Sequence, residues 1–427
     1  MKKNVFSSQN FRLVFFGALV SELGAILYSF AVSFYILEIS NNSAFLQGLY
    51  LAVCGIAMLI STPVGGVIGD RFNKAKIMFL CDYIKGGIIL LATVLMLLLP
   101  SAKAHIWILF TLGILGNVVS GIFNPASGAL LPHIVQEDQL QQANAYFAMK
   151  SSSESLLGIV LAGILYAALK IQTLFFFVGV CFIASGISEM LIRYEYRPVT
   201  EPLTLQSAVS DMREGIQYLK TKRAILIILF ASLFINFFAT PIMGNFTPFF
   251  IKTDLAGAPS YLFDKVLTPE LWSSVFEVCF GISSLLGAAI LSTRMQEEKS
   301  GHKTAVRICV LSGLLILLTI CYWQFVVRGV SLNAFLITYS LGFLAIGFMI
   351  AWINIPINTL TMRIVDKDKL SKVNSIISLG SQGMVPIASV LGGILLETGT
   401  LSLLIFSTLG FSITAVLMLF SRRLKEI

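Results

Sequence analysis

Runs of about 20 apolar residues, separated by short polar segments, recur along the whole chain. A run of that length crosses the hydrocarbon core of a bilayer as one α-helix. The pattern predicts twelve membrane-spanning helices, although only "KIQT" separates the fifth from the sixth, so hydropathy alone also allows eleven. The predicted spans are 12–39, 44–69, 75–99, 105–132, 141–168, 171–192, 224–251, 269–293, 304–327, 333–362, 371–397 and 400–421.

The composition fits this pattern. Hydrophobic residues make up 56% of the 427 residues and charged residues 12%, against about 45–50% and about 25% in soluble domains. A soluble fold of this length has no core large enough to bury so much apolar surface. The expected fold class is therefore an all-α polytopic membrane protein.

Basic residues are concentrated at the two termini and in alternate loops, which hold 23 of the 30 Lys and Arg residues. This bias places both termini in the cytoplasm, and two cytoplasmic termini require an even number of spans, which favours twelve. The bias also accounts for the net charge of +8, so no nucleic-acid partner is expected. We expect a monomer in the cell membrane, in contact with membrane lipid.

The chain contains an internal repeat. Residues 124–165 align without a gap with residues 354–395, and the matches include Asn and Asp as well as apolar residues. The alignment predicts two six-helix bundles, 1–192 and 224–427, that point the same way, with a substrate pathway between them near the midplane. In the cytosolic linker 193–223, an apolar stripe at helical spacing predicts an amphipathic surface helix; the stripe is Leu205, Val209, Met212, Ile216 and Leu219.

Five ionisable residues lie near mid-depth in the predicted spans: Glu22, Asp82, Lys85, Lys150 and Glu154. An uncompensated charge there costs about 2.5–3.5 kcal/mol on insertion scales, so such residues normally face a protein interior or a water-filled cavity. Lys150 and Glu154, four residues apart, could simply neutralise each other along one helix face, and Asp82 and Lys85, three apart, could do the same.

Glu22 has no such partner, because the residues one turn away from it are apolar. It must pair with Lys85, Lys150 or a substrate, or remain protonated. Desolvation of a buried carboxyl favours its protonated form, as a proton-coupling group requires. We therefore expect Glu22 to carry a coupling proton.

The loop after the second predicted span reads "GGVIGDRFNKAKIM", which resembles the loop signature of the major facilitator superfamily. The matching positions of this cytosolic gate motif are Gly66, Asp70, Arg71, Lys74 and Lys76. A glycine usual in the motif is replaced here by Asn73, which also tolerates left-handed backbone geometry. Glycines in such a loop let helices approach closely, and Asp70 is expected to stabilise a helix end near Leu370.

More narrowly, the chain resembles the macrolide-efflux-like branch of drug:proton antiporters. The resemblance rests on "FNPASGALLPHIVQEDQLQQANAY", "DMREGIQYLKTKRAI" and "FFGALVSELGAILYSFAVSFYIL". It implies the twelve-helix facilitator fold and export of small amphipathic substrates. Two features of the branch are missing, an arginine in the fourth span and a proline in the fifth.

In this family, spans 1 and 5 border a central cavity, so the resemblance implies that Glu22, Lys150 and Glu154 form one network. Polar and aromatic residues on the other cavity-facing spans are candidates for the substrate cavity, although each aromatic could equally pack between helices. These candidates are Asn117, Asn124, Phe234, Asn236, Phe237, Trp352, Asn354 and Gln382.

The sequence thus favours a proton-driven exporter of amphipathic or lipophilic compounds, with a lysolipid or other endogenous amphiphile as the alternative substrate. An enzyme should show clustered histidines or paired acids, and the three histidines are far apart. A membrane receptor or sensor without transport, the remote alternative, should carry an appended soluble domain, but the longest polar segment is only 193–223. The six cysteines form no disulfide or metal-binding pattern, and we expect no metal and no cofactor, with the proton gradient as the energy source.

Overall fold

The computed structural model describes residues 5–136, 139–194, 217–221, 223–255, 268–292, 300–365 and 370–421, and all regular structure in these ranges is helical. Eleven helices there are long and apolar enough to cross a membrane, and one further apolar helix, Val385–Thr398, is shorter. The predicted all-α membrane class is confirmed. The count of twelve single spanning helices is not, because the predicted span 371–397 consists of two short helices.

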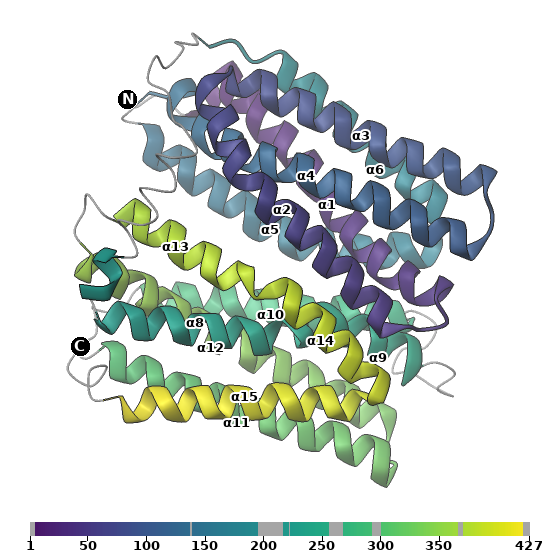
Figure 1. Cartoon of the computed structure of the whole chain (residues 1–427), viewed down its shortest axis with the longest axis vertical. Helices are drawn as coiled ribbons and strands as arrows, with labels where there is room; N and C mark the ends of the chain where they lie inside the picture. Colours follow the sequence, from purple (N-terminus) through teal and green to yellow (C-terminus); the bar gives the residue numbers. More distant parts are fainter. Residues whose placement is uncertain are drawn as a thin grey trace. The chain divides into compact units, whose positions relative to one another are not determined.

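Contacts divide the chain into two compact units, the first made of Met1–Asn42 and Val53–Thr204, and the second of Ser43–Ala52 and Leu205–Ile427. Figure 1 labels the helices. The first unit contains η1 (Val5–Ser7), α1 (Gln9–Ile39), most of α2 (Ala44–Arg71), α3 (Lys74–Leu98), α4 (Ala102–Ile134), α5 (Leu140–Ala168) and α6 (Ile171–Met190). The second contains α8 (Arg223–Thr240), η3 (Pro241–Phe246), α9 (Thr247–Thr253), α10 (Pro269–Ser292), α11 (Ser300–Arg328), α12 (Leu332–Ile364), α13 (Leu370–Gly383), α14 (Val385–Thr398) and α15 (Thr400–Phe420).

The fifth and sixth predicted spans are separate helices. α5 ends at Ala168 and α6 begins at Ile171, with Lys170 in extended geometry as the residue before α6. The ambiguity that the short "KIQT" segment left in the hydropathy pattern is thereby resolved.

The internal repeat is visible in the helix bounds. α4 begins at Ala102 and ends at Ile134, and α12 begins at Leu332 and ends at Ile364, each 230 residues further along. The last residues of α3 and α11, Leu98 and Arg328, are also 230 residues apart, and so are the last residues of α6 and α15, Met190 and Phe420. Matching helices also pack alike: α3 packs on α4 and α6 in the first unit, and α11 packs on α12 and α15 in the second. The two units therefore repeat one helix arrangement.

The repeat is broken between α13 and α14. α5 is a continuous helix, whereas its counterpart stops at Gly383 and resumes as α14 at Val385. Pro386 lies in the first turn of α14 and has no N–H to donate, so the preceding helix loses a hydrogen bond there. This proline explains why one predicted span appears as α13 and α14.

The first residues of α2 pack tightly within the second unit. A Cβ atom on Gly48 would lie 2.2 Å from the Ser389 carbonyl oxygen, and one on Gly393 would lie 2.4 Å from the Ala44 carbonyl oxygen. Only glycine allows such close approach of two helix backbones. α2 and α14 are therefore in direct backbone contact at these two glycines.

Most of the predicted linker 193–223 and its amphipathic stripe lies outside the described residues. Of that stripe, Leu219 is described, and it is buried in a small cluster with Val365 and Val373.

Candidate functional site

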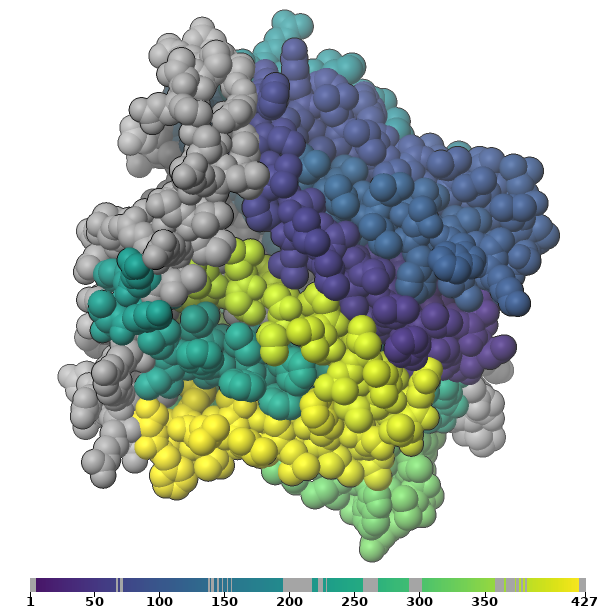
Figure 2. Space-filling view, viewed as in Figure 1, coloured from purple at the N-terminus to yellow at the C-terminus, as the bar shows by residue number. Residues whose placement is uncertain are grey.

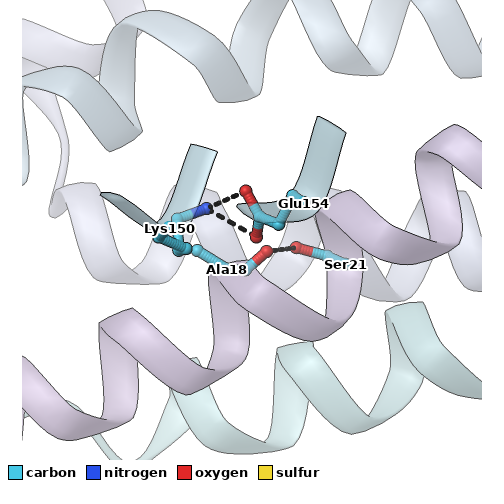
Figure 3. A network of polar contacts seen from close by, with 4 residues as sticks. All are labelled: Ala18, Ser21, Lys150 and Glu154. Atoms are coloured by element: carbon cyan, nitrogen blue, oxygen red, sulfur yellow. Dashed lines mark hydrogen bonds and ion pairs between the residues drawn. The ribbon is translucent and has the colours of Figure 1, made fainter. Parts of the chain in front are cut away.

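Lys150 and Glu154 form a closed ion pair on α5. The Lys150 ammonium donates to both carboxylate oxygens of Glu154, at 2.9 and 3.0 Å, and both side chains are buried. Figure 3 shows the pair beside Ala18 and Ser21 of α1, where the Ser21 hydroxyl donates to the Ala18 carbonyl at 3.3 Å. The spacing of four residues on one helix thus neutralises both charges, as one of the two sequence interpretations expected.

Glu22 lies near the middle of α1 and its side chain is exposed, so the burial on which its expected protonation rested is not found. It makes no hydrogen bond or ion pair with any residue that the structure describes, and neither Lys85 nor Lys150 reaches it at ion-pair distance. Electrostatic interactions nevertheless join it to Asp82 and Lys85 on α3 and to Glu154 on α5. The charge of Glu22 is therefore felt both by Asp82 and Lys85 on α3 and by the Lys150–Glu154 ion pair on α5.

Asp82 and Lys85 do not form the short ion pair that their spacing allows. Their charges interact, but the Lys85 ammonium lies 4.6 Å from the ring centroid of Phe182, in a cation–π contact. Asp82 is buried, and its Oδ2 atom has no hydrogen-bond partner within the described structure.

One charged residue of this group, Glu189 on α6, was not among the residues predicted from the sequence. It is fully buried, neither carboxylate oxygen has a described hydrogen-bond partner, and it interacts electrostatically with Asp82. Its position inside the span 171–192 was a signal that it lies in the membrane. Its nearness to Asp82 depends on the packing of α3 against α6, which the sequence does not reveal.

Several predicted cavity residues use their polar groups for structure. The Asn117 amide donates to the Gly113 carbonyl at 2.9 Å, and the Asn236 amide donates to the Ser232 carbonyl at 2.8 Å, each within its own helix. Trp352 donates its indole N–H to the Gly287 carbonyl at 3.0 Å and packs under the Arg307 guanidinium. Trp352 therefore joins α10, α11 and α12, and its place in a cavity wall stays a prediction.

The other polar candidates, Asn124, Asn354 and Gln382, are exposed within their units. Phe237 packs edge-on against Phe238. Phe234 lines a groove of about 350 Å³ between α8 and α15, together with apolar side chains that include Phe230, Ile413 and Leu417. Figure 2 shows these two helices side by side on one face, α8 in teal and α15 in yellow.

The predicted gate motif is partly described. Asn73 has an extended backbone rather than a left-handed one, and its side chain accepts a hydrogen bond from the Lys76 N–H at 3.2 Å, so it caps the start of α3. Lys74 is buried and Lys76 is exposed. The side chains of Asp70 and Arg71 and the segment 366–369 lie outside the described residues, so the expected contact of Asp70 near Leu370 stays a prediction.

The close helix approach expected at Gly66 occurs instead at Gly65. A Cβ atom on Gly65 would lie 2.4 Å from the Gly121 carbonyl oxygen on α4, whereas one on Gly66 would meet no atom within 4 Å. The two glycines are neighbours on one helix and face different directions, so only one of them can face α4.

We expect Gly65→Ala to destabilise the first unit, because its methyl group would meet backbone atoms of α4 that cannot move independently. The matched control Gly66→Ala should be neutral or stabilising by up to about 1 kcal/mol, since alanine favours the helix over glycine. Thermal unfolding of both variants in detergent measures the difference. Equal unfolding temperatures for the two variants would contradict the assignment of Gly65 to the α2–α4 contact.

The first unit thus gathers opposite charges from α1, α3, α5 and α6 inside membrane-spanning helices. Among the described residues, no group of three or more His, Cys, Asp or Glu side chains is arranged to hold a metal ion. Carboxylates and ammonium groups in such a setting exchange protons and partners, which is chemistry typical of a membrane transporter.

Comparison with known proteins agrees with that class. The family model of the Major Facilitator Superfamily matches residues 14–388. The chain belongs to this superfamily of membrane transporters and is an integral membrane protein.

Individual relatives include exporters. The uncharacterized MFS-type transporter YkuC of Bacillus subtilis is 24% identical over 87% of this chain and 82% of its own length. The putative bacilysin exporter BacE of Bacillus subtilis is 23% identical over 73% of each chain. Macrolide efflux protein A of Streptococcus pyogenes is 21% identical over 66% of this chain and 67% of its own.

A solved structure shares the fold. The crystal structure of a bacterial homologue of the iron transporter ferroportin, in its inward-facing state, superposes with a TM-score of 0.69. The likeness covers 95% of this chain and 98% of that one at 16% sequence identity. At that identity the likeness concerns the fold alone.

Proposed function

We propose that this transporter exports small amphipathic or lipophilic compounds from the cytoplasm in exchange for protons, by alternating access. Twelve transmembrane segments, with the broken α13–α14 pair as the eleventh, would place both termini in the cytoplasm of the cell. The export direction is supported by the names of BacE and macrolide efflux protein A. No cofactor takes part in this proposal, and the proton gradient supplies the energy.

The proposal of proton coupling rests on the position of Glu22. It is an ionisable side chain in the middle of a membrane-spanning helix, exposed, and without an ion pair among the described residues. A carboxyl in that setting can take up and release a proton without first breaking a salt bridge. Lys150 on α5, which packs on α1, and Lys85 on α3, whose charge interacts with Glu22, would be the cations that an ionised Glu22 approaches during the cycle.

A second substrate class, lysolipids or other endogenous amphiphiles, is favoured by a different observation. The groove between α8 and α15 is lined by apolar side chains on two membrane-spanning helices. Such a lining would accept an alkyl chain from the bilayer. Drugs and lipid-like amphiphiles are therefore tested side by side.

Transport into everted vesicles tests both substrate classes. We expect vesicles that contain the protein to accumulate an amphipathic cation such as a fluorescent dye when their interior is acidic, and to lose this accumulation when a protonophore collapses the pH gradient. The control is a vesicle preparation with Glu22→Gln at equal expression. Accumulation of the dye that persists without any ion gradient would contradict proton coupling, and a gradient-dependent flux of lysolipid alone would reject the first substrate class.

A further inference from the structure

The α3–α6 interface of the first unit contains two buried acids that the proposed transport cycle does not use. Asp82 is 1% exposed and Glu189 is 0% exposed. Contacts of the adjacent residues fix their level: the Tyr83 hydroxyl lies 3.8 Å from the Met190 sulfur, and a Cβ atom on Gly186 would lie 2.9 Å from the Tyr83 ring. Asp82 and Glu189 each precede one of these contact residues, so both lie in the same layer.

The carboxylate oxygens of this layer are poorly supplied with hydrogen-bond donors. Three of the four carboxylate oxygens, both of Glu189 and Oδ2 of Asp82, have no hydrogen-bond partner in the described structure, although all are buried. The Ser185 hydroxyl lies close enough to Asp82 to act as its donor, although the pair falls outside strict hydrogen-bond geometry, so the two Glu189 oxygens are the ones left without a described donor. A buried carboxylate that accepts no hydrogen bond is costly, so this layer lacks at least one donor hydrogen.

The charges around the pair can be counted among the described residues. Lys85 is the one cation that acts on it, and Glu22 from α1 and the Cys81 thiol are the other titratable neighbours. Two ionised carboxylates and Lys85 would leave one buried negative charge, and two protonated carboxyls would leave one buried positive charge. A single proton gives a neutral layer, and two adjacent carboxyls that share one proton are a known solution to like-charge repulsion.

The matching interface of the second unit indicates that the fold does not need acids here. Ser312 on α11, 230 residues beyond Asp82, shares a hydrogen bond of 2.7 Å with Ser412 on α15. Thr319 and Thr408 form a second such pair at 2.9 Å. Neutral hydroxyls therefore close the same helix pair with satisfied hydrogen bonds, and the carboxyls of the first unit add an ionisable function to the common packing.

We propose that Asp82 and Glu189 bind one proton between them, as a second proton site of the protein that is distinct from Glu22. The bound proton supplies the missing hydrogen bond between α3 and α6, and Lys85 balances the remaining negative charge. At alkaline pH the proton leaves, and two like charges then face each other inside the interface. This site depends on the fold of the first unit and needs neither substrate nor transport.

Infrared difference spectroscopy of the purified full-length protein tests the site directly. On raising the pH we expect the wild type to lose the C=O stretching band of one protonated carboxyl. Glu189→Gln and Asp82→Asn should each lack that band, because either variant leaves one carboxylate beside Lys85. The control Glu270→Gln, which removes a carboxylate paired with Lys252 at 3.4 Å, should keep it. A band that survives in both variants, or disappears in only one of them, overturns the shared proton.

Thermal unfolding across the same pH range gives a second reading. The wild type should lose stability at alkaline pH, and Glu189→Gln should not, so the variant becomes the more stable protein there. If Asp82→Asn does not fold, Glu189→Gln alone decides. A wild type with no alkaline loss overturns the proposal, and so does an alkaline loss that sodium or lithium ions prevent, because the ligand would then be a metal cation. Neither the infrared nor the unfolding measurement involves export, so a negative result for the shared proton would not affect the proposed role of Glu22.

Discussion

Glu22→Gln should abolish concentrative export driven by a pH gradient while the binding of uncharged substrates persists. The glutamine is nearly the same size and cannot titrate, so the protein would resemble the protonated form throughout. Because the side chain is exposed and makes no described ion pair, its replacement leaves no partner uncompensated, and folding should be nearly unaffected. This separates a coupling defect from a stability defect.

Glu22→Asp tests the same role from the other side. Aspartate keeps a carboxyl that can titrate, on a side chain that is one methylene shorter, so part of the pH-driven export should remain. The measurement is substrate-induced proton release from purified protein, together with transport in proteoliposomes. The neighbouring substitution Leu23→Met is a control for disturbance of α1. Proton coupling equal to that of the wild type in the Glu22→Gln protein would transfer the role to Glu154.

Local spacing made part of the charged site predictable. Lys150 and Glu154 are one helical turn apart, so their contact depends on one helix only, and the sequence contains that information. The isolation of Glu22 on its own helix was readable for the same reason. The repeat offset was readable because it requires only that two segments of one chain be compared.

Features that depend on how two helices are rotated against each other were not predictable. Gly65 and Gly66 are equivalent in the sequence, and only the packing of α2 on α4 distinguishes them. The hydrogen bond from the Trp352 indole to the Gly287 carbonyl on α10 likewise depends on a helix rotation that the sequence does not show. Glu189 was overlooked because its partner, Asp82, lies more than one hundred residues away in the chain.

The repeat also clarifies what the ion pair of α5 contributes to folding. The positions 230 residues beyond Lys150 and Glu154 are Gly380 and Met384, both uncharged, and Met384 lies at the break between α13 and α14. The second unit therefore folds around the same helix arrangement without this pair. Two opposite charges have been added to a helix whose counterpart does without them.

Breaking the Lys150–Glu154 pair should have a large effect on stability. Lys150→Met and Glu154→Gln, made singly, should each destabilise the protein by about 3–5 kcal/mol, because each leaves a buried charge without its counter-charge. The double variant should recover most of that loss, since the pair disappears as a unit. Thermal unfolding of the three variants measures this, and the double variant of Lys252 and Glu270 is the control. That pair is partly exposed, so its single substitutions should cost much less.

Export should not recover in the same way. If Lys150 is a cation that ionised Glu22 approaches during the cycle, the double variant folds but remains defective in pH-driven export, and its preference shifts away from anionic substrates. Transport in proteoliposomes at matched protein amounts decides the outcome. Full export by a stable double variant would mean that Lys150 and Glu154 only neutralise each other, and Lys85, held over the Phe182 ring without a short ion pair, would remain as the cation available to Glu22.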